Sequence, residues 1–192
     1  MARPRVRERL LDAAYFVLQN EGVSALTTRY IAKQAGTTEA SVFNNFGDKA
    51  GLMYALIGER LPEVRSVQQA IAAQLDGNPR HWLEEIYQTA EQFYFLVLPL
   101  TFPLWRGGSG PEGSTHFPLH RALHSALQAL QVRGSISKTA DTGVLATLLL
   151  GAALHAAMNR LAQGESALAD EGTAGGAERI IASLASLLVH AE

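Results

Sequence analysis

Ala32, Gly36 and Val42 have the spacing that a close crossing between two short helices requires. Where the helices touch, the first needs a small residue and the second an apolar one, and the turn between them needs a glycine. The spacing therefore predicts a helix-turn-helix within residues 27–46. The rest of its small core is expected to come from five apolar side chains: Leu10, Val17, Ile31, Ala35 and Phe46.

Capping residues divide this part of the chain into short elements. Thr27 is placed to cap a helix that Gly36 ends, and Thr38 to cap a second helix that Gly47 ends. Asp48 is placed to cap a further helix that runs to about residue 60. A short hydroxyl or carboxylate side chain can accept the unpaired N–H groups of a first helical turn, which is why these positions predict helix starts.

The remainder of the chain also has helical patterning and no alternation of the kind that predicts strands. We expect Pro99 and Pro103 to kink or end the aromatic-rich helix that contains them. Residues 107–114 are expected to form a loop, and the Gly- and Ala-rich residues 164–176 a connector. The predicted fold is all-α, with about nine helices. Outside the short elements, helices are expected at about residues 6–21, 63–75, 79–98, 119–132, 139–162 and 177–190.

Charge separates the two ends of the chain. Residues 1–60 hold eight Lys and Arg against six Asp and Glu, whereas the remainder holds eight against twelve. This asymmetry, and the arginines at positions 3, 5, 7 and 9, indicate that the first part meets a polyanion, although a solvated tail explains the arginines equally well. The absence of cysteine excludes disulfides, and no apolar leader segment is visible, so a cytoplasmic location is expected.

Residues 27–49 carry a resemblance to a known family. Thr27-Thr28-Arg29-Tyr30-Ile31-Ala32-Lys33-Gln34-Ala35-Gly36 resembles the second helix and turn of TetR-family regulators. Residues 37–49, which end in Phe46-Gly47-Asp48-Lys49, resemble the recognition helix and the start of the fourth helix. The resemblance implies a three-helix DNA-binding domain at residues 1–50 and a helical ligand-binding and dimerisation domain at residues 51–192. Beyond residue 60 only the length and the helical character match.

The register of the recognition helix indicates which side chains meet DNA. Asn44 and Asn45 suit adenine, Ala40 and Ser41 suit a thymine methyl or a base edge, and Lys49 suits a phosphate. The complete set of expected DNA contacts is Arg5, Thr27, Thr28, Arg29, Thr38, Glu39, Ala40, Ser41, Phe43, Asn44, Asn45 and Lys49.

Three departures from the family pattern predict a weaker hold on phosphates. Phe43 stands where the family usually has tyrosine, and Asn44 and Asn45 lack the positive charge that is often found there. Glu39 stands where lysine is common, and its carboxylate either accepts a hydrogen bond from cytosine N4 or repels the DNA backbone.

The apolar helix expected at residues 139–162 must be buried on most of its surface. It is too short and too polar at its end for a membrane span, so burial within the chain or in a dimer remain as the alternatives. A four-helix dimer interface formed with the last helix is what the resemblance implies. The residues expected there are Leu148, Ala152, Ile180, Leu184, Leu187 and Leu188.

Aromatic and histidine side chains in the middle of the chain are candidates for a ligand site or for ordinary core. They are Trp82, Tyr87, Phe93, Tyr94, Phe102, Trp105, His116, His120 and His155. His120 and His124 are one helical turn apart and raise the alternative of a metal-dependent helical enzyme, although histidines at the edge of an apolar stripe explain the spacing without metal.

The sequence thus predicts a homodimeric, ligand-responsive regulator, acting as a repressor on palindromic operator DNA and released by a small, largely apolar effector. It predicts neither enzymatic activity, nor a metal or other cofactor, nor a membrane partner. A helix-turn-helix that serves only as a protein-interaction module is the other alternative.

Overall fold

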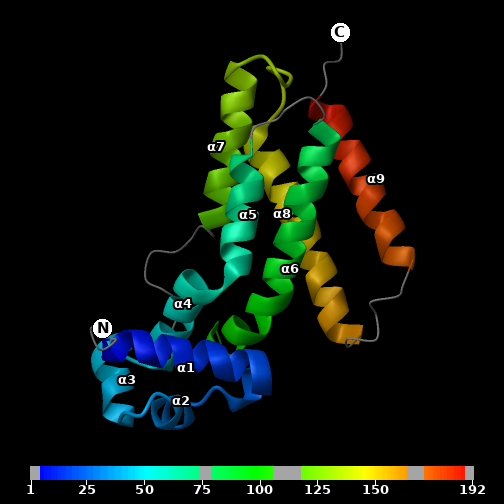
Figure 1. Cartoon of the computed structure of the whole chain (residues 1–192). Helices are drawn as coiled ribbons and strands as arrows, with labels where there is room; N and C mark the ends of the chain where they lie inside the picture. Colours follow the sequence, from blue (N-terminus) through cyan, green and yellow to red (C-terminus); the bar gives the residue numbers. More distant parts are fainter. Residues whose placement is uncertain (1–4, 74–78, 106–117, 164–170, 189–192) are drawn as a thin grey trace. The chain divides into compact units, whose positions relative to one another are not determined.

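The computed structural model describes residues 5–73, 79–105, 118–163 and 171–188. These residues form nine α-helices, one short 3-10 helix and no strand, so the all-α prediction is confirmed (Figure 1). The chain divides into two compact units. The first contains Met1–Val64 and Val97–Pro111, and the second contains Arg65–Leu96 and Glu112–Glu192.

Four helices of the first unit pack on one another. Helix α1 contacts α2, α3 and α4, and α3 contacts both α2 and α4. This unit reaches beyond the predicted domain boundary after residue 50, because it contains all of α4; the boundary as a division of function stays a prediction. The elements are α1 (Val6–Glu21), a 3-10 turn (Val23–Ala25), α2 (Thr28–Gln34), α3 (Glu39–Phe46) and α4 (Lys49–Arg60).

The crossing of α2 and α3 follows the predicted spacing. Ala32 and Val42 are buried where the two helices pack, and Gly36 has a φ of +62° in the turn. The N–H of Thr37 donates to the carbonyl of Ala32 at 2.9 Å, and the N–H of Gly36 donates to that of Lys33 at 3.1 Å. This pair of bonds is a Schellman motif, and its left-handed residue favours glycine. Leu10, Val17, Ile31 and Ala35 are buried as predicted, whereas Phe46 is only half-buried.

Two of the three predicted caps are confirmed. The Thr27 hydroxyl accepts the N–H of Tyr30 at 3.2 Å, and the Asp48 carboxylate accepts the N–H of Gly51 at 2.7 Å. Thr38 precedes α3 as predicted but makes no side-chain cap, because its hydroxyl is bonded to the Ser41 hydroxyl at 3.1 Å instead.

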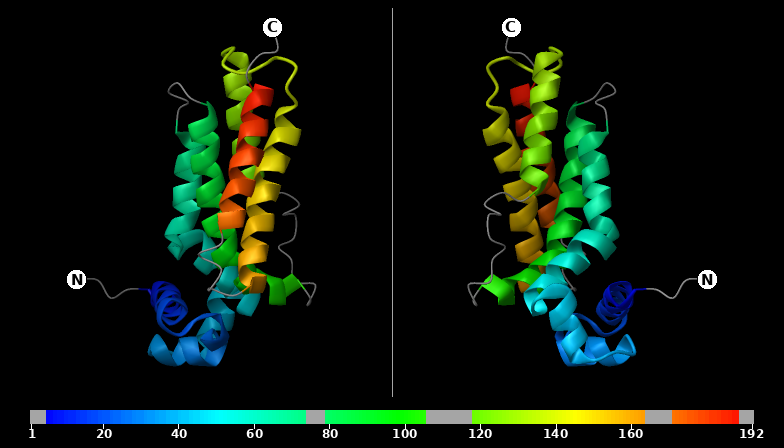
Figure 2. Two further views of the ribbon diagram at one scale, coloured as in Figure 1. Left: turned by 90° about the vertical axis from the view of Figure 1, so that its right-hand side faces the viewer. Right: turned by 90° about the vertical axis from the view of Figure 1, so that its left-hand side faces the viewer.

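The second unit is a bundle of longer helices. Helix α8 (Thr142–Gln163) lies beside both α7 (Pro118–Val132) and α9 (Glu171–Leu188), as Figure 2 shows. Helix α5 (Pro62–Ala72) and helix α6 (Pro79–Trp105) each cross the division between the units. Within the second unit, the Trp82 indole N–H donates to the carbonyl of Ala70 at 3.0 Å and so ties α6 to α5.

Two predicted bounds of the longer helices are wrong. Helix α6 does not end near residue 98 but continues past Pro99 and Pro103 to Trp105, although each proline removes a backbone donor; the kink that the prolines also predict stays a prediction. Leu98, Leu100 and Thr101 are buried around Pro99, and this packing outweighs the local cost of the proline. The predicted connector is also too long, because α9 already begins at Glu171 and includes residues 171–176. The loop expected at residues 107–114 lies outside the described residues.

Helix α8 is the one described helix that is long and apolar enough to cross a membrane, by length and composition only. It begins where the Asp141 carboxylate accepts the N–H groups of Gly143 and Val144, both at 3.0 Å. Seven of its residues are buried, among them Leu145, Leu149 and Ala153. The helix is therefore a core element of the bundle on one side only.

Candidate nucleic-acid interface

Helix α3 has one buried side and one open side. Val42 is fully buried and fixes the helix to the core of the first unit. The opposite side exposes Phe43 to 48% of its full surface, and the neighbouring predicted contacts are also exposed: Glu39, Ala40, Asn44 and Asn45. An exposed helix of two turns on a compact three-helix core has the geometry with which helix-turn-helix domains enter the major groove.

The two asparagines on this side are not equivalent. The Asn45 side-chain amide donates to the carbonyl of Ser41 at 2.7 Å, so its N–H group is turned back onto its own helix. The Asn44 side chain makes no hydrogen bond to any described residue. Because pairing with adenine needs both the amide N–H and the amide oxygen, Asn44 is the better placed of the two.

Hydroxyl groups surround the beginning of α3. The Ser41 hydroxyl lies 2.9 Å from that of Thr37 and 3.1 Å from that of Thr38. On α2, the Thr28 hydroxyl donates to the Glu39 carboxylate at 2.5 Å. The Thr28 proton is therefore used within the protein, whereas the two bonds among Thr37, Thr38 and Ser41 use two of their three hydroxyl protons and leave one for a phosphate or a base edge.

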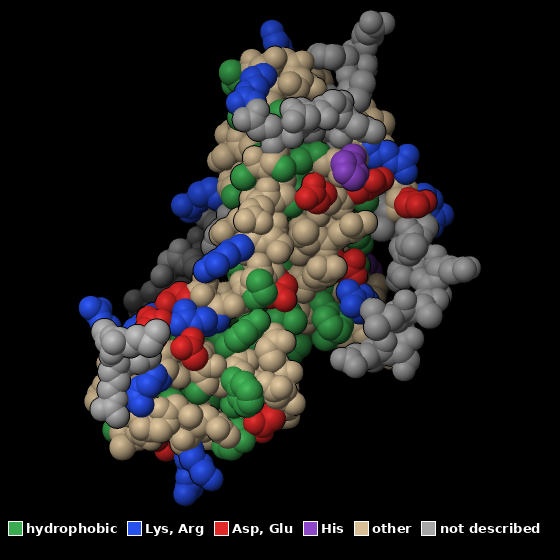
Figure 3. All heavy atoms as spheres, in the orientation of Figure 1, with side chains coloured by type: hydrophobic (Ala, Val, Ile, Leu, Met, Phe, Trp, Pro, Cys, Tyr) green, Lys and Arg blue, Asp and Glu red, His purple; other side chains and the backbone are tan. Residues whose placement is uncertain are grey.

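Several exposed basic side chains belong to α2, to the start of α4 and to the residue before α1. Arg29 and Lys49 are exposed and form no ion pair with any described residue, and Arg5 is exposed just before α1. Lys33, also exposed, was missed from the sequence although it is on the same short helix as Arg29. On the face of this unit shown in Figure 3, Lys and Arg side chains alternate with Asp and Glu.

Two of the N-terminal arginines are not part of a tail. Arg7 donates both terminal N–H groups to Glu59, at 2.7 and 2.6 Å, and its guanidinium lies 5.2 Å from the centre of the Phe46 ring. Arg9 donates to the carbonyl of Ala35 at 3.1 Å, at the end of α2. Both arginines therefore stabilise the helix-turn-helix, and Arg5 is the only described member of the cluster that precedes α1.

Ion pairs connect α1 to the last turn of α4. Arg60 is bonded to Glu8, and its Nε donates to Asp12 at 2.8 Å. Hydrogen bonding to Arg7 lowers the pKa of Glu59, and hydrogen bonding to Glu8 and Asp12 raises the pKa of Arg60. We call Arg7, Glu8, Asp12, Glu59 and Arg60 the α1–α4 ion cluster. Sequence reasoning missed it because its partners are 48–52 residues apart.

Gly51 fixes the corner between α3 and α4. A Cβ atom built on this glycine lies 2.0 Å from the carbonyl oxygen of Phe46, far inside any allowed contact. Gly51 also donates its N–H to the capping carboxylate of Asp48. The first turn of α4 therefore approaches the last turn of α3 more closely than any other residue type at position 51 permits. Sequence reasoning missed this glycine, which lies inside a helix and not at its end.

Comparison with known proteins decides what this domain is. The family model described as "Bacterial regulatory proteins, tetR family" matches residues 10–56, the span from α1 to α4. This part of the chain therefore matches the TetR family of bacterial regulatory proteins. The HTH-type transcriptional regulator YvkB of Bacillus subtilis (strain 168), itself uncharacterized, is 44% identical over 52 residues, which are 27% of this chain and 28% of that protein.

Solved structures show that the likeness of fold extends over the whole chain. The crystal structure of a TetR-family regulator from Mesorhizobium loti MAFF303099 has a TM-score of 0.69 at 16% identity, covering 97% of this chain and 98% of that chain. Thermus thermophilus FadR, a TetR-family repressor in complex with lauroyl-CoA, has a TM-score of 0.63 at 18% identity, covering 97% and 96%. Matches in sequence span only 28–52% of the length of the curated relatives. TetR-family proteins are transcription factors and not enzymes.

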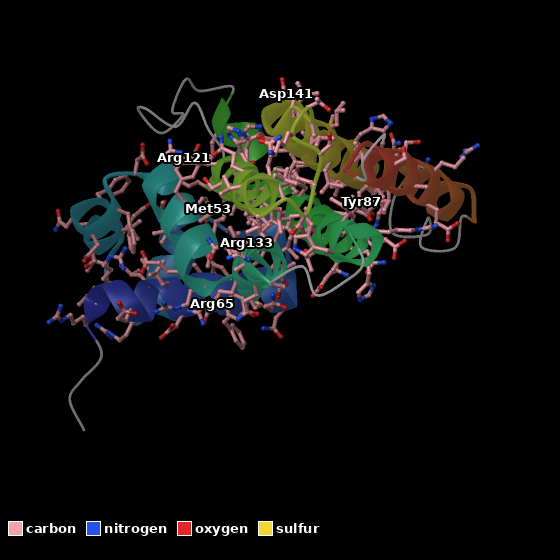
Figure 4. The ribbon with its side chains drawn as sticks, turned by 90° about the horizontal axis from the view of Figure 1, so that it is seen from above. Met53, Arg65, Tyr87, Arg121, Arg133 and Asp141 are labelled. Atoms are coloured by element: carbon pink, nitrogen blue, oxygen red, sulfur yellow. The ribbon has the colours of Figure 1, made fainter. Side chains whose placement is uncertain are left out.

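The ligand residues expected from the sequence do not form one group. Tyr87, Phe93 and Tyr94 of α6 are buried in the second unit, and Figure 4 labels Tyr87 there. The rings of Phe93 and Tyr94 are 5.3 Å apart, and burial raises the pKa of Tyr94 to about 12. Trp82 is tied to α5 by its indole, whereas Phe102 is exposed in the first unit. His116 and the Trp105 side chain lie outside the described residues.

Polar groups of the second unit are paired with one another. His120 is bonded to the Thr147 hydroxyl at 2.9 Å, and the rings of His120 and His124 are 6.2 Å apart. No group of three or more possible metal ligands occurs among the described residues, so the two histidines gain no third partner there. Arg160 donates to Glu91 at 3.1 Å and lies 4.2 Å from the centre of the Phe95 ring.

One side of α8 is exposed and largely apolar. Val144, Leu148 and Met158 are 51%, 49% and 46% exposed, and Gly151 and His155 lie between them at alternating spacings of three and four residues. That repeat is typical of a seam between two helices. Of the predicted interface residues, Leu148 and Ile180 are exposed, Ala152 is half-buried and Leu184 is buried in the chain. The Leu187 and Leu188 side chains lie outside the described part of the structure.

Proposed function

We propose that this chain is a ligand-responsive transcriptional repressor that binds palindromic operator DNA as a homodimer and is released by a small, largely apolar effector. The observation that carries the proposal is the exposed side of α3, held on a rigid core by Val42. In this proposal residues 1–50 bind DNA, residues 51–192 bind the effector and dimerise, and the protein acts in the cytoplasm.

The α3 helix reads bases in the major groove, and groups around it hold phosphates. Asn44 pairs with adenine, supported by its lack of a hydrogen bond to any described residue, and the exposed ring of Phe43 packs on a thymine methyl. The phosphate contacts are Arg5, Thr27, Arg29, Thr38 and Lys49, each of which is exposed. Ser41, Ala40 and Asn45 complete the surface at its edges.

Dimerisation presents two copies of α3 to two half-sites. The exposed apolar side of α8, with Val144, Leu148 and Met158, supports this role, because an apolar side of this length on a soluble regulator is normally covered. A two-fold axis through such a surface matches the symmetry of a palindromic operator.

The effector is proposed to contact the buried aromatic part of α6. Tyr87, Phe93 and Tyr94 supply an apolar environment with few polar groups, which suits a hydrophobic ligand. The structurally similar FadR from Thermus thermophilus, which binds lauroyl-CoA, supports an acyl chain as the first ligand to test.

Selection of duplexes from a random pool by the full chain tests DNA binding. We expect enrichment of two half-sites related by two-fold symmetry and separated by about 10 base pairs or a multiple of it. Failure to enrich any duplex would contradict the proposal and favour a protein-interaction module.

The selected duplex then serves to test the effector. We expect lauroyl-CoA and laurate to release the protein from the duplex and to raise its melting temperature, while free CoA does neither. Equal operator affinity with and without both acyl compounds would contradict an acyl effector.

A further inference from the structure

Glu39 is the only acidic residue in α3, and it lies in the first turn on the exposed side of the helix. It forms no ion pair with any residue that the structure describes. An unneutralised carboxylate on a surface that approaches DNA costs affinity, unless DNA offers it a hydrogen-bond donor. The question is therefore which group on DNA this carboxylate meets.

We infer that Glu39 is a specificity-determining residue that selects cytosine, through its N4 amino group, at one position of each half-site. The inference rests on the proposed DNA-binding function and adds a particular base preference to it. Thr28 is the positioning residue: its hydroxyl holds the Glu39 carboxylate in place for this contact.

The bond from Thr28 fixes where the carboxylate is. The Thr28 hydroxyl donates to Oε1 of Glu39 at 2.5 Å, while Oε2 has no partner among the described residues. Thr28 itself is half-buried in the first turn of α2, directly after the cap formed by Thr27. The carboxylate is thus held across the two helices, and one oxygen with its lone pairs remains available to DNA.

The chemistry of the major groove then selects the base. A carboxylate only accepts hydrogen bonds, so guanine, with O6 and N7, and thymine, with O4, repel it. Adenine offers N6 but places the acceptor N7 beside it, whereas the major-groove edge of cytosine itself carries only the N4 donor. Because the carboxylate is anchored by Thr28, it cannot turn away to solvent without losing that bond. Cytosine is therefore preferred and the other bases are rejected.

Binding of the full chain to a panel of single-base variants of the selected duplex tests the inference. We expect wild type to prefer cytosine at one position per half-site by about 5- to 100-fold. Glu39→Gln keeps the size of the side chain but replaces a carboxylate oxygen with an N–H donor. We expect this variant to lose the preference for cytosine at that position and to prefer adenine instead. Thr28→Val weakens the same preference, and Thr28→Ser retains it.

Controls separate base reading from simple charge. Glu85→Gln, an exposed change of the same charge on α6, leaves every base preference unaltered. If Glu39→Gln strengthens binding to all duplexes by one common factor, Glu39 acts only on phosphates and the inference is wrong. If Thr28→Val leaves the cytosine preference intact, Thr28 does not position the carboxylate. If the wild-type chain enriches no duplex at all, the proposed DNA-binding function is itself wrong. That outcome is distinct from the two variant results above, because both require wild type to bind a selected duplex.

Discussion

The two units of the chain are stabilised in different ways. In the first unit, short helices meet at corners that depend on single residues, such as Gly36 at φ +62°, Asp48 as a cap and Gly51 beneath the Phe46 carbonyl. In the second, long helices bury apolar stripes, and α8 alone contributes seven buried residues. The polar contacts between helices there, such as the bond from the Trp82 indole to the Ala70 carbonyl, add to this apolar packing.

This difference explains which unit keeps a recognisable sequence. A corner that requires glycine, or a carboxylate that caps a helix, tolerates few other residues at that position. An apolar stripe accepts many substitutions of similar volume. The family model accordingly matches residues 10–56, inside the first unit. Identity to curated relatives falls from 44% over 52 residues to 29% over 116 residues, while the likeness of fold covers 97% of the chain.

The sharpest test of the second unit is a charge on the exposed side of α8. Leu148→Glu is expected to prevent dimerisation, because it places a carboxylate in an apolar seam, and to weaken operator binding by roughly 100-fold or more as the second half-site is lost. Sedimentation measures the mass and a binding titration the affinity.

The α8 experiment needs two comparisons. Ala129→Glu, exposed on α7, is expected to leave the dimer intact, whereas Leu149→Glu, buried on α8, is expected to unfold the unit. A Leu148→Glu protein that remains dimeric would contradict the proposed interface.

A single methyl group tests the corner in the first unit. Gly51→Ala places a Cβ against the Phe46 carbonyl, and we expect it to lower the free energy of unfolding by about 3 kcal/mol. Gly58→Ala, in the same helix with nothing within 4 Å of its Cβ, is expected to raise that free energy by about 0.5–1 kcal/mol. Urea unfolding measures both. Equal changes in the free energy of unfolding for the two variants would show that the close approach at Gly51 does not contribute to stability.

The two asparagines of α3 are expected to differ in how much they contribute to discrimination between bases. Asn44→Ala is expected to reduce discrimination at one adenine by about 5- to 100-fold, and Asn45→Ala to have a smaller effect because its amide is already bonded to Ser41. Titration of base-substituted duplexes measures this. Larger loss from Asn45→Ala would reverse the assignment.

Lys49 is the proposed phosphate contact with which the asparagines can be compared. Lys49→Ala is expected to weaken binding to specific and random duplexes alike and to reduce the slope of log affinity against log salt by about one. A loss confined to one base pair would contradict a phosphate role.

The smallest effect is expected from the α1–α4 ion cluster. Because the pKa of folded Glu59 lies below its ordinary value of 4.5, its stabilisation is present at neutral pH and is lost as the pH falls below about that value. Both partners are more than a third exposed, so we expect a coupling below about 1 kcal/mol between Arg7→Ala and Glu59→Ala. Unfolding at pH 7 and pH 3 measures it, and coupling that is unchanged at pH 3 would contradict this assignment.

Local sequence patterns predicted most of the first unit, whereas features that depend on contacts between distant residues were missed. The capping roles of Thr27 and Asp48, the turn at Gly36 and the helical periods of α7 and α8 all follow from neighbouring residues. The path of α6 through Pro99 was missed because packing overrode a local rule. The bond from Thr28 to Glu39 and the turning of Asn45 onto Ser41 depend on side-chain rotamers, which a sequence pattern does not specify.

The missing side chain at position 51 has a mechanical consequence for the first unit. The Phe46 carbonyl packs against the Cα of Gly51, and the Asp48 carboxylate accepts the Gly51 N–H, so the junction between α3 and α4 is tightly packed. We therefore expect a displacement of α4 to move α3 and its exposed side chains with it. In the proposed function, DNA that holds α3 in place would hold α4 as well.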